Sequence, residues 1–121
     1  MVTQKSDAIK HAEQRQACSL AALTAETKAA DLKQVIKFVE AEIKATIAGE
    51  IGEDEKPRYS NDAKRDAEFI RRAAQDARLR KYEAELSAAE VKTATKKIDA
   101  QYHADCVRIL VGFAEAGKEV Q

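Results

Sequence analysis

The sequence predicts an all-α protein, and three observations support this class. The 121-residue chain contains 24 alanines, and 35% of its residues are charged while only 5% are aromatic. Such a composition is typical of long helices. Four glycines and one proline are too few for a β-sandwich, which needs turn residues about every ten positions. Most of these turn residues also gather in one place, because Gly49, Gly52 and Pro57 lie close together.

The first predicted helix covers about residues 6–48. Large apolar residues recur three or four positions apart in its second half, which is helical periodicity. These residues are Leu32, Ile36, Val39, Ile43 and Ile47. Gly49 follows the last of them, and glycine commonly ends a helix.

A polar turn is predicted over residues 49–60, and a second helix over about 61–116. Ser60 or Asn61 can accept hydrogen bonds from the first free amides of that helix, and Asp62 suits the positive end of its dipole. Gly117 is the expected stop. Apolar residues cover a wide arc near the end of this helix.

Two long helices joined by a short turn predict one domain, residues 1–121, folded as a long antiparallel hairpin resembling a coiled coil. A hairpin leaves apolar flanks exposed, so we expect a homo-oligomer, most simply a dimer forming a four-helix bundle. The alternative is a bend in one helix, which would give a shorter three- or four-helix monomer. The expected interface residues are Leu32, Ile36, Val39, Ile43, Ile98, Tyr102, Ile109 and Phe113.

Charge and apolar patterning exclude several classes of protein. The chain has 21 basic and 21 acidic residues, so its overall charge gives no attraction to nucleic acid. No apolar run has the length of a membrane span, and residues 1–10 do not resemble a signal peptide. Two cysteines, Cys18 and Cys106, do not make a disulfide framework. We therefore expect a cytoplasmic, non-enzymatic protein without a cofactor.

The two histidines are the first candidate site. In the predicted hairpin, facing positions sum to roughly 110, so His11 lies near Ala100 and within about a turn of His103. A divalent metal could use such a pair, but the Glu-x-x-His motif of helical-bundle metal sites is absent. Cys106 is close to His103, yet no oxyanion hole accompanies it. We expect neither a metal site nor a catalytic residue here.

One stretch of the second helix, residues 64–81, has a local excess of basic side chains. The candidate phosphate-binding residues are Lys64, Arg65, Arg71, Arg72 and Arg78. Arginine suits phosphate because its planar guanidinium is always charged. The alternative is a solvated face, neutralised by pairs one turn apart such as Lys64–Glu68 and Arg72–Asp76.

The residues from Lys56-Pro57-Arg58-Tyr59-Ser60-Asn61 to Arg108-Ile109-Leu110 resemble a family of small helical proteins from bacteriophages and integrated elements. In that family a K-P-x-Y-x-N turn begins a long charged helix. The resemblance implies an accessory role in phage DNA metabolism and no particular activity. Two functions are therefore expected: a scaffold or adaptor that binds itself or a partner protein, or a DNA-binding accessory factor in recombination or replication.

Overall fold

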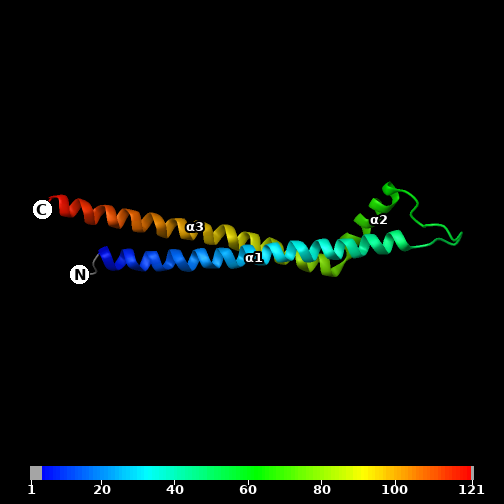
Figure 1. Ribbon diagram of the computed structural model, residues 1–121, viewed down its shortest axis with the longest axis horizontal. Coiled ribbons are helices and arrows are strands. Elements are labelled where there is room, and N and C mark those ends of the chain that lie inside the picture. The colour runs from blue at the N-terminus through cyan, green and yellow to red at the C-terminus, as the bar shows by residue number, and fades with distance from the viewer. Residues whose placement is uncertain (1–3, 121) are drawn as a thin grey trace. The chain divides into compact units, whose positions relative to one another are not determined.

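The computed structural model describes residues 4–120 and contains three helices, α1 (Gln4–Gly49), α2 (Asp62–Gln75) and α3 (Ala77–Val120) (Figure 1). The predicted all-α class, with α1 packed antiparallel to α3, is confirmed. Contacts divide the chain into two compact units. Unit 1 contains residues up to 27 and from 89 onward, and unit 2 contains residues 28–88.

Unit 1 is an antiparallel pair made from the first half of α1 and most of α3 (Figure 1). Small side chains fill the contact between the helices, because Ala22, Ala25 and Ala89 are buried there. His11 lies directly against His103, so the predicted register, which placed His11 near Ala100, is displaced by about one turn.

Unit 2 has a conventional apolar core. Val39, Ile43 and Ile47 of α1 pack with Leu79 of α3. Other apolar side chains cover this cluster from α1, the turn, α2 and α3, namely Ile36, Tyr59, Phe69, Ala73 and Tyr82. Ile47 and Leu79 are the most deeply buried of all the described side chains.

Half of the residues predicted to form the oligomer interface are instead covered within the chain itself. Leu32, Val39 and Ile43 are buried within the chain, and Ile36 is half-buried. The helical periodicity that marked these residues reflects their contact with other parts of the same chain. They are therefore unavailable to a second copy.

The turn over residues 50–61 is held by backbone hydrogen bonds. Gly52 N donates to Lys56 O at 2.8 Å, and Arg58 N donates to Glu50 O at 2.9 Å. Glu55 occupies the left-handed region with φ 63°, which residues other than glycine adopt only at some cost. Asn61, one of the two cap residues that the sequence predicted, caps α2, since its Oδ1 accepts from Lys64 N at 2.9 Å.

The second predicted helix is not continuous, because it breaks at Asp76. This residue has an extended backbone, with ψ 116°, between α2 and α3. Its Oδ1 accepts hydrogen bonds from the backbone amides of Arg78 (2.9 Å) and Leu79 (3.1 Å), so it begins α3 as a cap. The break lets Phe69 on α2 and Leu79 on α3 pack against the same core.

The expected stop at Gly117 is also wrong, because α3 continues through it to Val120. Nothing lies within 4 Å of the position a Cβ would take at Gly117. Glycine costs a helix only about 1 kcal/mol relative to alanine, which is not enough to end it without a competing contact.

No helix in residues 4–120 has an apolar segment long enough to span a membrane.

Candidate interaction surface

A row of large apolar side chains lies exposed along α3 in unit 1. The row, called here the α3 stripe, consists of Val91, Ile98, Tyr102, Ile109 and Phe113. These side chains are between 53% and 69% exposed, although they belong to residue types that usually pack inside proteins. Their spacing alternates between seven and four residues, an 11-residue period that keeps the side chains on one face of a helix.

The α1 helix of unit 1 shows the same distribution of large and small side chains. Leu20 and Leu23 are 57% and 59% exposed, whereas Ala22 and Ala25 beside them are buried against α3. In this part of unit 1, small side chains lie between the helices and large apolar ones lie outside, whereas Val107 and Leu110 further along α3 are half-buried. The exposed half of the predicted interface, Ile98, Tyr102, Ile109 and Phe113, belongs to this surface.

The two histidines form a direct polar contact between the helices of unit 1, in addition to the Glu26–Lys97 ion pair at 3.7 Å. His11 Nδ1 lies 2.8 Å from His103 Nδ1, and the ring centroids are 5.1 Å apart. The contact joins residues separated by 92 positions in the sequence. Both side chains are half-buried.

Tyr102 connects the histidine pair with the α3 stripe. Its ring meets His11 edge to face at a centroid distance of 6.2 Å and His103 at 5.1 Å. A side-chain hydrogen bond with Cys106 raises the pKa of the Tyr102 hydroxyl above its ordinary value. Cys106 and Cys18 are both free thiols.

The basic residues predicted to bind phosphate are largely paired with carboxylates. Arg72 reaches across from α2 to Glu50 at 2.7 Å and also bonds Glu68 at 2.7 Å. Arg71 shares Glu68, and Arg65 pairs with Asp62. The surface pairs differ from those expected, because Glu68 pairs with Arg71 and Arg72 and does not pair with Lys64.

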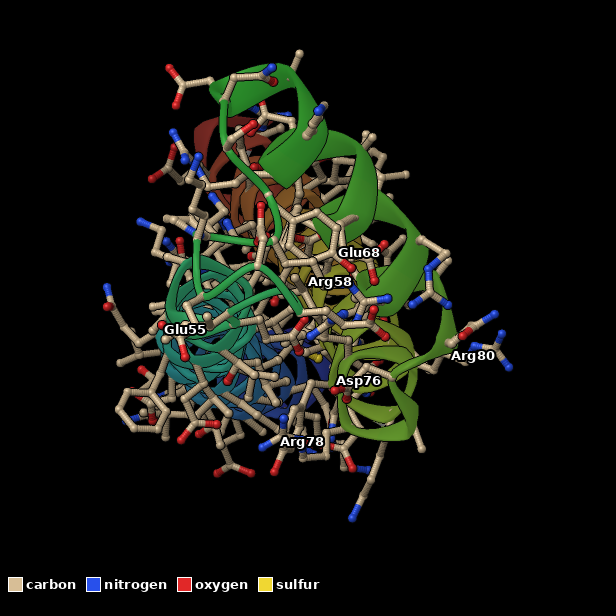
Figure 2. The ribbon with its side chains drawn as sticks, turned by 90° about the vertical axis from the view of Figure 1, so that its right-hand side faces the viewer. Glu55, Arg58, Glu68, Asp76, Arg78 and Arg80 are labelled. Atoms are coloured by element: carbon tan, nitrogen blue, oxygen red, sulfur yellow. The ribbon has the colours of Figure 1, made fainter. Side chains whose placement is uncertain are left out.

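Arg78 is the fourth paired arginine, and it lies at the beginning of α3. It bonds Glu42 of α1 at 3.0 Å and Asp76 at 3.2 Å, and Figure 2 shows it beside Asp76. The expected Arg72–Asp76 pair is therefore replaced by Arg78–Asp76. Arg80 points away from this pair and donates to Ala74 O, at the end of α2 (Figure 2). Of the five predicted residues, Lys64 alone has no ion pair with another described residue.

These ion pairs shift the pKa values of the carboxyl groups involved. Hydrogen bonds from Arg71 and then Arg72 lower the pKa of Glu68 from 4.5 to about 2. The bond from Arg72 lowers the pKa of Glu50, and the bond from Arg78 lowers that of Asp76. Four of the five predicted phosphate ligands thus have anionic partners that a phosphate would have to displace.

No group of three or more His, Cys, Asp or Glu residues able to hold a metal ion occurs among the described side chains. Comparison of the chain with protein-family models, with curated proteins and with solved structures finds no match. The resemblance to phage-encoded helical proteins and the predicted DNA contact both stay predictions.

Proposed function

We propose that this protein is a non-enzymatic helical scaffold that self-associates through the apolar surface of unit 1. The observation that supports this most strongly is the reversed distribution of side-chain sizes, with alanines between the helices and leucine, isoleucine and aromatic side chains outside. A helix pair that functioned alone would bury its largest apolar side chains between its own helices.

The amount of exposed apolar surface is suitable for a dimer. Eight large apolar side chains of unit 1 are each more than half exposed: Ile9, Leu20, Leu23, Val91, Ile98, Tyr102, Ile109 and Phe113. Together they present on the order of 500 Å² of apolar surface. A stable interface buries about 800 Å² on each partner, of which a little over half is apolar.

The charge of unit 1 favours a second copy as the partner. Residues 5–27 contain three basic and three acidic side chains, and residues 89–117 contain four of each. Two copies of a neutral surface do not repel each other. A strongly acidic or basic partner would gain little attraction from this surface. The spacing of the α3 stripe also allows a self-complementary seam, as a two-fold dimer requires.

The test compares the oligomeric state of the wild-type chain with that of a stripe variant. Sedimentation equilibrium between about 1 and 100 μM should give a dimer for the wild type, and Ile98→Ser with Ile109→Ser should weaken it about a thousandfold. This estimate takes about 1 kcal/mol for each of the four substituted sites in a two-fold dimer. A wild-type chain that is monomeric at 100 μM would contradict the proposal.

A matched control is available in unit 2. Phe38 is 66% exposed on α1 but lies outside the α3 stripe. Phe38→Ser removes a comparable amount of exposed apolar surface, and we expect it to leave the dimer intact. Circular dichroism of both variants checks that helix content is unchanged. Equal weakening by the two variants would assign the association to general hydrophobicity and would contradict a specific seam.

A further inference from the structure

The contact between His11 and His103 depends on one shared proton. At 2.8 Å the two Nδ1 atoms are at hydrogen-bond distance, and one nitrogen must donate while the other accepts. Two neutral imidazoles satisfy this arrangement, and so does one neutral imidazole beside one charged imidazole. When both rings are charged, each Nδ1 carries a proton and the acceptor is lost.

The geometry favours a shared proton over a shared metal ion. Two imidazoles bound to tetrahedral zinc at about 2.0–2.1 Å hold their nitrogens about 3.3 Å apart, and both point at the ion. Here the nitrogens are closer than that. No third His, Cys, Asp or Glu joins them in a metal-binding group within the described part of the chain.

The charged and titratable groups around the pair come from both helices of unit 1. On α1, Asp7 and Arg15 lie one turn before and one turn after His11. On α3, Asp99 lies one turn before His103. Cys106 lies one turn after His103 and is hydrogen-bonded to Tyr102. Glu26–Lys97 and Asp105–Arg108 are ion pairs of unit 1, and neither includes an imidazole. Neither Asp7 nor Asp99 is within ion-pair distance of either ring to offset a second positive charge.

We propose that His11 and His103 form a pH-sensitive latch that closes the helix pair of unit 1 at neutral pH and opens it on acidification. Unperturbed imidazole gains its proton near pH 6.5. In the unfolded chain the two rings are separate and both become charged below that pH. The folded pair resists the second charge, so the unfolded state binds more protons and stability falls as pH decreases from about 7 to about 5.

The latch also connects with the proposed self-association, and this part of the inference depends on the proposed function. Tyr102 belongs to the α3 stripe and contacts both imidazoles. When the latch opens, the two helices lose the polar contact beside Tyr102, and this part of the surface is held less firmly. We therefore expect the dissociation constant of the dimer to be higher at pH 5 than at pH 7.5. The increase should be about tenfold for each proton that the closed histidine pair disfavours over this range.

The latch is tested by urea unfolding at pH 7.5 and pH 5.0. The unfolding equilibrium constant of the wild type should rise about tenfold on acidification, and His11→Gln with His103→Gln should remove this rise. Measuring both chains in the Ile98→Ser, Ile109→Ser background separates the latch from self-association. An equal rise with and without the histidines would overturn the latch, whatever the oligomeric state.

A second measurement needs no substitution at the histidines. The imidazole carbon-bound protons report the charge of each ring in an NMR titration of the wild-type chain. Because the two Nδ1 atoms share one hydrogen bond, we expect the two rings to titrate as a coupled pair and not as independent groups. Two independent single-proton curves at the same pH would overturn the proposal. If the latch is present but the wild-type dimer is insensitive to pH, only the link with self-association fails.

Discussion

At the scale of single residues, Arg72 joins parts of unit 2 that are distant in sequence. It bonds Glu50 beyond the end of α1 and Glu68 on its own helix, and its guanidinium lies 5.9 Å from the centre of the Tyr59 ring. Arg71 is a natural comparison because it bonds the same Glu68 but is more exposed and has no bond to Glu50. Comparing substitutions of these two adjacent arginines therefore distinguishes the effect of a tertiary contact from that of a contact within one helix.

We predict that Arg72→Ala lowers the urea midpoint of unfolding more than Arg71→Ala does. The first substitution leaves Glu50 without its closest cation, whereas the second leaves Glu68 still bonded to Arg72. Exposed pairs within one helix contribute little to stability. Chemical unfolding followed by circular dichroism measures the difference, and equal midpoints would show that the link to Glu50 contributes nothing.

The low pKa of Glu68 predicts how unit 2 responds to acid. Its folded pKa of about 2 lies below its ordinary value of 4.5, owing first to Arg71 and then to Arg72. Its contribution is therefore complete above pH 4.5 and is lost as pH falls from about 4.5 to about 2. Urea midpoints between pH 2 and 6 should fall less steeply for Glu68→Gln than for the wild type. Glu83→Gln, at an exposed position on α3, should keep the wild-type slope.

At the scale of elements, Asp76 separates α2 from α3 without any glycine or proline. Its carboxylate accepts two backbone amides at the start of α3 and also pairs with Arg78. We predict that Asp76→Asn keeps most of the stability, because asparagine is an equally good cap. Asp76→Ala should lose both roles and lower the unfolding midpoint clearly. Similar losses in the two variants would instead assign the effect to the ion pair.

The core of unit 2 gives the largest expected effect on stability. Ile47 is 1% exposed and packs in the cluster of Val39, Ile43 and Leu79, so Ile47→Ala leaves a cavity. We predict a loss of about 2–5 kcal/mol in the free energy of unfolding. Ile51→Ala, at a residue 68% exposed in the turn, should change it by less than about 0.5 kcal/mol. Urea denaturation of the two variants measures both values.

These elements show how far the sequence could predict the fold. The first helix, the turn and a cap at Ser60 or Asn61 were predicted because each has a local signal: apolar periodicity, clustered glycine and proline, and a side chain that accepts amide bonds. The break at Asp76 has no such signal. Helix-forming residues surround it, and only the need for Phe69 and Leu79 to reach one core makes the break favourable.

The candidate site was harder to predict from the sequence because it depends on register. Facing positions that sum to 110 put His11 beside Ala100, whereas a change of about one turn brings it against His103. Periodicity alone also could not separate apolar residues buried within the chain, such as Val39, from exposed ones such as Ile98. Both sets have helical spacing, and only the path of α2 and α3 decides which set is covered.

At the scale of the whole molecule, self-association makes thermal stability depend on concentration. A dimer binds its second copy only when folded, so mass action raises the melting temperature as protein concentration rises. We predict this rise for the wild type between about 1 and 100 μM, followed by circular dichroism. Ile98→Ser with Ile109→Ser should melt at one temperature throughout that range, and Phe38→Ser should behave as the wild type does. A wild-type melting temperature that does not change with concentration would mean that the apolar surface of unit 1 is not occupied by a second copy, and the partner would then have to be a different protein.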